Sequence, residues 1–140
     1  MKIANVVRII FGFVLLAGAV TNAFLALTQP EIYTSFADTA IVPVYRELWQ
    51  SLVMPYLGFW LGLTVLFELT MGILLLSKGV WVKGGLVAAI LFFLLLVPFW
   101  WEGGAGINIV FAVIVVLLLR YDYDASVIDL IRRRRPPQSA

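Results

Sequence analysis

The feature that most constrains this chain of 140 residues is a series of four apolar runs, each close to the length that crosses a lipid bilayer. A helix rises about 1.5 Å per residue, so about 20 apolar residues cover a hydrocarbon core of about 30 Å. These runs predict an all-α membrane protein in which residues 1–123 form a four-helix transmembrane bundle. The expected spans are about Ile9 to Leu27, Pro55 to Leu76, Val80 to Trp101, and Ala105 to Leu119.

The composition excludes a water-soluble globule and most metal chemistry. Hydrophobic residues make up 63% of the chain and charged residues 13%, whereas soluble domains average about 45–50% apolar and 25% charged residues. The chain has no Cys and no His, which removes disulfides, thiolate zinc sites, iron–sulfur clusters and the usual haem ligands. We therefore expect no metal site, no catalytic residue that the sequence identifies, and no cofactor other than a quinone or lipid.

The basic residues predict the orientation of the bundle, because positively charged segments resist translocation. With four crossings, every Lys and Arg except Arg46 falls on one side of the membrane, which predicts a multi-pass protein of the plasma membrane with both termini in the cytoplasm. The opposite side is acidic. Because the basic residues follow this topology signal, the bilayer is the expected partner and nucleic acid is not. The residues on the basic side are Lys2, Arg8, Lys78, Lys83, Arg120 and Arg132 to Arg135, and the acidic ones opposite are Glu31, Asp38, Glu47 and Glu102.

Two segments outside the spans have amphipathic patterns. Residues 28–54 are predicted to form two short helices in the outer membrane interface, with Pro30, Pro43 and Pro55 marking their limits. Residues 124–140 are predicted to form a cytoplasmic surface helix, capped by Asp124, followed by a basic tail.

Small residues at a spacing of four predict where helices approach each other closely. We interpret these pairs as packing positions within one bundle. They are Ala19 with Ala23, Gly58 with Gly62, Gly84 with Ala88, and Gly85 with Ala89.

Glu68 lies about 13 residues into the second predicted span, at or past the bilayer midplane. An acid at this depth is costly, and it must be protonated, paired or exposed to a water-filled cavity. Arg8 is the predicted partner for an ion pair, and Thr64 shares the face of Glu68. Two interpretations stay open here: a structural ion pair or hydrogen bond that fixes the bundle, and a site that exchanges protons or binds a ligand.

A second polar group is predicted at the outer end of the bundle, where amides and a carboxyl lie among aromatic residues. It fits an aromatic-walled pocket for a flat amphipathic ligand such as a quinone headgroup. The alternative is an interfacial aromatic belt with satisfied amides. The candidate pocket residues are Asn22, Trp60, Trp100, Trp101, Glu102 and Asn108.

A short set of residues resembles the DoxX family of small four-helix membrane proteins. Residues Arg8, Gly12 and Gly18 in the first span and the run from Glu68 through Gly72 to Gly79 carry the resemblance. It covers about residues 5 to 119, while the long outer segment and the absence of His depart from the family pattern. The resemblance implies an association with respiratory or redox assemblies.

These observations leave three functional hypotheses. The first is a non-catalytic or weakly catalytic bundle, DoxX-like, that serves as an accessory small subunit of a larger membrane complex and contributes to a quinone or lipid site. The second is a proton-coupled transporter of hydrophobic small molecules that uses Glu68. The third is a lipid- or sterol-binding four-helix protein.

Overall fold

The computed structural model describes residues 3–99 and 101–132, and within these ranges the chain is helical and contains no strand. The short elements between the long helices include 3-10 turns and one π-helical turn, η2. The elements in chain order are α1 (Ile3–Thr28), η1 (Pro30–Thr34), α2 (Ser35–Asp38), α3 (Pro43–Leu48), η2 (Trp49–Val53), η3 (Met54–Tyr56), α4 (Leu57–Leu76), α5 (Val80–Leu96), α6 (Trp101–Leu118) and α7 (Val127–Arg132).

Two helical stretches are long and apolar enough to cross a membrane: α1, and the continuous stretch Pro43–Leu76 that ends with α4. Two further apolar helices, Val80–Leu96 and Gly104–Leu118, are shorter. The third predicted span is too long, because α5 ends at Leu96 and a turn follows that contains Pro98. Proline lacks the N–H that would continue the helix. Trp101 therefore lies in α6 and does not cap α5.

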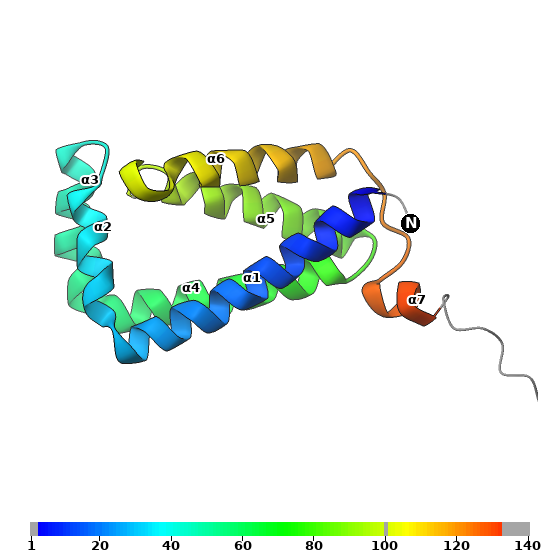
Figure 1. Cartoon of the computed structure of the whole chain (residues 1–140), viewed down its shortest axis with the longest axis horizontal. Coiled ribbons are helices and arrows are strands. Elements are labelled where there is room, and N and C mark those ends of the chain that lie inside the picture. Colours follow the sequence, from blue (N-terminus) through cyan, green and yellow to red (C-terminus); the bar gives the residue numbers. More distant parts are fainter. Residues whose placement is uncertain (1–2, 100, 133–140) are drawn as a thin grey trace, which may run out of the picture.

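Helices α1 and α4 run side by side in opposite directions (Figure 1). Two glycines let them approach closely: a Cβ at Gly72 would lie 3.0 Å from the carbonyl oxygen of Gly12, and one at Gly12 would lie 2.7 Å from Leu76 Cδ2. The predicted Gly58–Gly62 pair is not in this contact, since a Cβ at either position meets no atom within 4 Å. Gly12 and Gly72 face the partner helix, whereas Gly58 and Gly62 do not.

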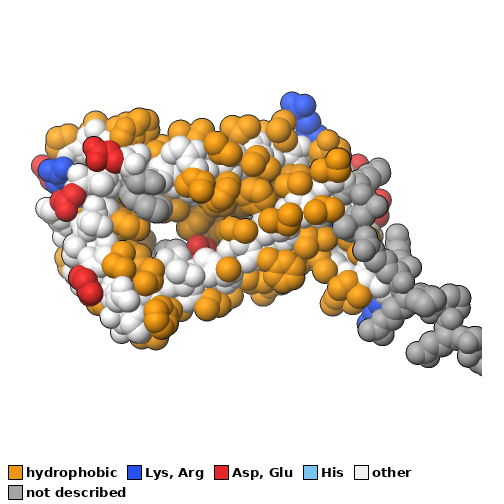
Figure 2. Space-filling model, viewed as in Figure 1, with side chains coloured by type: hydrophobic (Ala, Val, Ile, Leu, Met, Phe, Trp, Pro, Cys, Tyr) orange, Lys and Arg blue, Asp and Glu red, His pale blue; other side chains and the backbone are white. Residues whose placement is uncertain are grey.

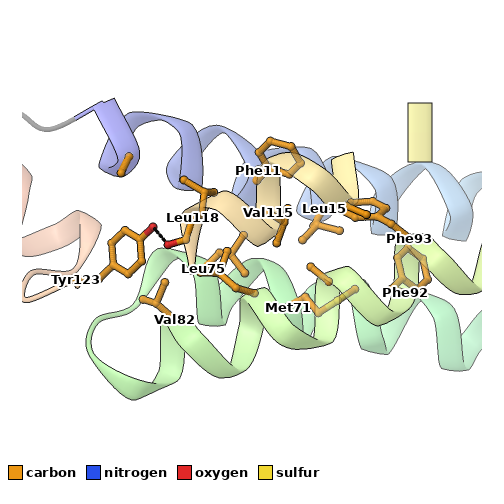
Figure 3. Packing of buried hydrophobic residues seen from close by; sticks show 14 residues of the cluster. Phe11, Leu15, Met71, Leu75, Val82, Phe92, Phe93, Val115, Leu118 and Tyr123 are labelled. Carbon is orange, nitrogen blue, oxygen red and sulfur yellow. Dashed lines mark hydrogen bonds between the residues drawn. The ribbon is translucent and has the colours of Figure 1, made fainter. Parts of the chain in front are cut away.

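Helices α5 and α6 form the second pair, and α5 also packs on α4. Gly85 permits this contact, because a Cβ there would lie 2.8 Å from the Cβ of Leu74, whereas Gly84 meets nothing. The two pairs enclose an apolar core at the end of the molecule near α7 (Figure 3). Its fully buried members include Met71, Leu75 and Val115.

At the other end the two helix pairs diverge, and the segment from η1 to η3 spans the open end (Figure 1). Hydrogen bonds attach it to the α5–α6 connection: Ile41 N donates to Pro98 O at 3.0 Å, and Trp101 N donates to Thr39 O at 3.1 Å. The predicted prolines act as expected, since each stands in the first two positions of a helical element, η1, α3 and η3. This end segment has its own buried cluster, formed by Tyr33, Ala37, Trp49 and Leu61.

Helix α7 begins after Ser126, so the prediction that Asp124 caps it is wrong. The backbone N–H of Asp129 donates to Ser126 Oγ at 3.2 Å, and the backbone N–H of Ser126 donates to Asp129 Oδ2 at 3.0 Å. This reciprocal arrangement is a capping box, which satisfies two N–H groups at once. Ile128 and Ile131 are exposed, as expected of a surface helix. The remainder of the predicted basic tail lies outside the described residues.

Candidate ligand site beside Glu68

A chain of hydrogen bonds connects three elements at the centre of the molecule. The Tyr33 hydroxyl in η1 donates to Asn22 Oδ1 in α1 at 2.9 Å, and Asn22 Nδ2 donates to Glu68 Oε2 in α4 at 2.9 Å. Tyr33 is 3% exposed and Glu68 is 6% exposed. Of the two carboxyl oxygens, Oε2 therefore has a fixed donor in the part of the chain that the structure describes.

The carboxyl of Glu68 fits against α1 because the facing residue is Gly18. A Cβ at position 18 would lie 2.8 Å from Glu68 Oε1. Any larger residue would displace the carboxyl from its place beside Asn22. Gly18 and Glu68 thus meet across the helix pair, a contact that the sequence alone did not predict.

The predicted ion pair between Arg8 and Glu68 is wrong. In the antiparallel register of α1 and α4, Gly18 faces Glu68, and Arg8 lies ten residues earlier, about 15 Å along the helix axis. The two side chains therefore reach different ends of the pair. Lys78 and Lys83 do not pair with Glu68 either: Lys78 pairs with Asp129 at 3.5 Å, and Lys83 donates to Leu119 O.

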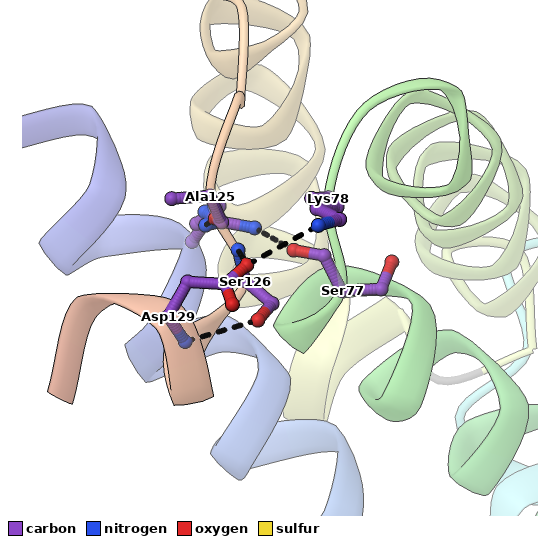
Figure 4. A network of polar contacts seen from close by, with 6 residues as sticks. Ser77, Lys78, Ala125, Ser126 and Asp129 are labelled. Atoms are coloured by element: carbon purple, nitrogen blue, oxygen red, sulfur yellow. Dashed lines mark hydrogen bonds and ion pairs between the residues drawn. The ribbon is translucent and has the colours of Figure 1, made fainter. Parts of the chain in front are cut away.

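Arg8 binds the carboxyl end of α4 and the segment before α7 instead. Its Nη1 donates to Leu75 O at 3.0 Å and to Ser77 O at 2.7 Å, and its Nη2 donates to Ala125 O. These carbonyls come from the end of α4 and from the segment before α7, near the network in Figure 4. The guanidinium carbon also lies 4.8 Å from the centroid of the Tyr123 ring. The last carbonyls of a helix have no partner within it, and Arg8 supplies donors to them.

A cavity of about 180 Å³ adjoins the Tyr33–Asn22–Glu68 chain. Thr64 also lines it, and its hydroxyl donates to Trp60 O at 2.9 Å. Figure 2 shows that this face of the molecule is hollowed between the helix pairs, with an acidic side chain inside the hollow. The rest of the cavity wall is apolar and formed by Phe36, Trp49, Leu61, Phe92, Leu96 and Phe99.

Two further cavities adjoin the first and extend along the groove between α4 and α5. Their volumes are about 320 and 440 Å³, and Thr64 and Phe92 line all three. The larger one reaches Leu63 and Leu91, which are 47% and 63% exposed. The three cavities together therefore lead from an apolar outer surface to the buried carboxyl. The two larger ones are within the range of volumes of small-molecule sites, about 300–1,000 Å³.

Most of the hydrogen-bond donors around these cavities are already in use. Trp49 Nε1 donates to Tyr33 O at 2.8 Å, Trp60 Nε1 donates to Leu52 O at 3.0 Å, and the hydroxyls of Tyr33 and Thr64 donate as described above. The capacity left over is Glu68 Oε1, which accepts hydrogen bonds when the carboxyl is ionised, together with one N–H of Asn22. The site is thus suited to a ligand group that donates hydrogen bonds or carries positive charge.

Tyr33 keeps its proton in this arrangement. Its burial, and then the nearby carboxyl of Glu68, raise the pKa of the phenol above its ordinary range. A protonated phenol is the form that donates to Asn22, so the hydrogen-bond chain has one fixed direction, from Tyr33 toward Glu68.

The structure assembles only part of the predicted outer pocket. Asn22 lines the cavity beside Glu68, and Trp60 lines the two adjoining cavities. Asn108 is buried in α6, where its Nδ2 has no hydrogen-bond partner among the described residues, and it lines none of these three cavities. Glu102 and Trp101 are exposed, and Trp100 lies outside the described residues. Asn22 therefore acts with Glu68, and the two groups that the sequence separates are partly one site.

Several site residues carry no signal in the sequence. Tyr33 and Phe36 stand out only as aromatic members of an amphipathic segment, and Phe92 and Phe99 belong to a uniformly apolar run. Their role depends on the end segment folding over the diverging helices, which no local pattern indicates.

The two ends of the molecule differ in charge. The end closed by α2 and α3 carries the exposed acids Glu31, Asp38 and Glu47. Arg46, at the same end, donates to the carbonyl oxygens of Ala37 and Asp38 at 3.1 Å each. At the end near α7, Lys78 pairs with Asp129 and Lys83 with Asp122.

The described ranges contain no group of three or more carboxylates placed so that they could hold a metal ion. Comparison with family models, with curated proteins and with solved structures gives no match to this chain.

Proposed function

We propose that this chain is a four-span integral membrane protein, with both termini in the cytoplasm, that binds an amphipathic molecule from the lipid phase. In this proposal it is a DoxX-like accessory subunit of a respiratory or redox complex and has no catalytic activity of its own. The observation that carries the ligand site is the Tyr33–Asn22–Glu68 chain at the closed end of an apolar cavity.

The cost of burying the carboxyl supports a functional role. An ionisable group within a membrane costs about 2.5–3.5 kcal/mol or more, and such groups usually mark a pathway or a binding site. Packing alone would be served by an apolar residue at position 68. The structure instead provides Gly18 to make room for the carboxyl and Asn22 to hold it.

The route to the site supports a ligand that arrives from the lipid. The groove between α4 and α5 is lined by exposed apolar residues such as Leu63 and Leu91, and it leads toward Thr64 and Glu68. A molecule with an apolar body and one polar end can place its polar end at the carboxyl while its body stays in the groove.

Photolabelling tests this binding role. An aliphatic alcohol that carries a diazirine is added to the purified protein in lipid nanodiscs, and the labelled peptides are mapped after irradiation. We expect labels on residues that line the cavities. Thr64→Phe fills the space that the three cavities share, and it should reduce this labelling by about tenfold.

Thr70→Phe is the matched control, because Thr70 also lies on α4, also bonds a carbonyl four residues earlier, and is exposed. It should leave the labelling unchanged. Equal labelling of the cavity residues in both variants would exclude the cavity as a ligand site.

The role as a subunit has a separate test. Native mass spectrometry of the protein, extracted gently from its own membrane, should find other chains or stoichiometric quinone bound to it. A protein that is always alone and free of quinone would argue against the accessory redox role and leave the binding role to the photolabelling.

A further inference from the structure

We propose that the ligand of this cavity is a lipophilic cation, a protonated amine or an onium ion with an apolar body. This inference rests on the proposed binding role and specifies the chemical class that the site selects.

The charge balance of the site favours a cation. Glu68 is buried, and no Lys or Arg lines any of the three cavities among the residues that the structure describes. Among the described residues, its hydrogen-bond donor is the neutral amide of Asn22. Arg8, which could have neutralised it, is held at the far end of α1 by helix carbonyls. A bound cation would supply the missing opposite charge within a medium that screens charges weakly.

The hydrogen-bonding groups that line the cavities favour a ligand that donates. The indole N–H groups of Trp49 and Trp60 are committed to backbone carbonyls, and the Tyr33 and Thr64 hydroxyls have acceptors. Glu68 Oε1 is left as an acceptor. An ammonium N–H can donate to it, whereas a quinone carbonyl would find one free N–H of Asn22 as its donor.

The aromatic wall of the cavity also favours a cation. Tyr33, Phe36, Trp49, Phe92 and Phe99 surround the space next to the carboxyl. The face of an aromatic ring attracts a cation, and quaternary ammonium groups are recognised in aromatic cages for this reason. Aliphatic side chains would give an equally apolar wall without this preference.

The surface at the end of the molecule nearest the cavity is acidic. The segment that closes the cavity carries exposed Glu31, Asp38 and Glu47, while its basic residue, Arg46, is bound to carbonyls of the same segment. A surface of one dominant sign raises the local concentration of ions of the opposite sign. The long-range field and the buried carboxyl therefore favour the same charge on the ligand.

Two ions of closely similar shape and opposite charge test the proposal. Binding of tetraphenylphosphonium and of tetraphenylborate to the full-length protein in detergent is measured by equilibrium dialysis. We expect saturable binding of the phosphonium that Thr64→Phe abolishes, and no saturable binding of the borate. This comparison uses the wild-type protein, so it decides the question even if a variant at position 68 fails to fold.

Glu68→Gln removes the charge and keeps an oxygen that can accept from Asn22. It should weaken phosphonium binding by about tenfold or more. Asp122→Asn is the control, because Asp122 is an exposed acid at the opposite end of the molecule, 3.6 Å from Lys83. It should bind the phosphonium as the wild type does.

Each outcome decides between the two proposals. Equal phosphonium affinity in the wild type and in a folded Glu68→Gln variant, or equal saturable binding of both ions, would overturn the inference. If the alcohol labels the cavity and neither the phosphonium nor a protonated long-chain alkylamine binds, the binding role stands and the cationic class is wrong. If neither occupies the cavity, both proposals fail.

Discussion

Replacement of Arg8 by Lys is the sharpest test of how this fold is held together. Arg8 is 0% exposed and donates to three carbonyls, those of Leu75, Ser77 and Ala125. Its Nε donates to Asn5 Oδ1 at 2.9 Å, and its guanidinium carbon lies over the Tyr123 ring, whereas no carboxylate pairs with it among the described residues. Lys keeps the charge but lacks the planar fork that reaches several acceptors at once.

The magnitude follows from the bonds that Lys cannot reproduce. A hydrogen bond to a charged group contributes about 1.5–3 kcal/mol, and a buried acceptor left without a donor adds to the loss. With about two of the carbonyls unsatisfied, Arg8→Lys should lower the free energy of unfolding by about 3–5 kcal/mol. The measurement is reversible unfolding in mixed micelles of a mild detergent and sodium dodecyl sulfate, followed by circular dichroism.

Arg46→Lys is the matched control, since Arg46 also donates to two carbonyls but is exposed. Water can replace its bonds, so the cost should stay below about 1 kcal/mol. If the two substitutions lower the stability equally, then burial of the Arg8 carbonyl site is not what makes it important, and the reasoning is refuted.

Two more predictions concern the helix seam and the capping box. Gly72→Ala places a Cβ 3.0 Å from the Gly12 carbonyl oxygen and should lower the free energy of unfolding by about 1–3 kcal/mol in the same assay. Gly62→Ala is the control, because a Cβ there meets nothing within 4 Å, and it should be neutral or stabilising. Equal effects of the two substitutions would contradict the close contact between α1 and α4 at Gly72. Backbone and side-chain hydrogen bonds from Ser126 lower the pKa of Asp129. Its contribution is therefore complete above the unfolded pKa and is lost as the pH falls through the folded one, in the range below about pH 4. Asp129→Asn should remove this part of the acid dependence of stability, and an unchanged dependence would argue against it.

Local patterns predicted much of the framework. The apolar runs gave the long helices, because hydrophobic length and the absence of breaking residues are properties of consecutive residues. The prolines gave the starts of η1, α3 and η3, since a fixed φ and a missing N–H act within one turn. The exposed apolar positions of α7 were also evident from spacing alone.

Two of the errors, the Arg8–Glu68 ion pair and the Gly58–Gly62 contact, share one cause, which is how one helix lies against another. Arg8 and Glu68 looked like partners because each is an unusual charge in an apolar run, but pairing depends on which turn of α1 faces which turn of α4. Gly58 and Gly62 have the spacing of a close-packed seam and lie on the wrong face of the helix. Neither fact is contained in the sequence of one helix.

The candidate site shows the same division. The sequence by itself determined that a carboxyl is buried in apolar surroundings and that an amide lies in a neighbouring span, because residue type and depth follow from position along the chain. The tertiary structure alone decided that Asn22 and Tyr33 hold Glu68, and that Phe92 and Phe99 face it across a cavity. Contacts of this kind join residues far apart in the chain, and they are set by close packing between helices. Local hydrophobicity is nearly the same for every register of an apolar helix, so only the packed molecule selects one.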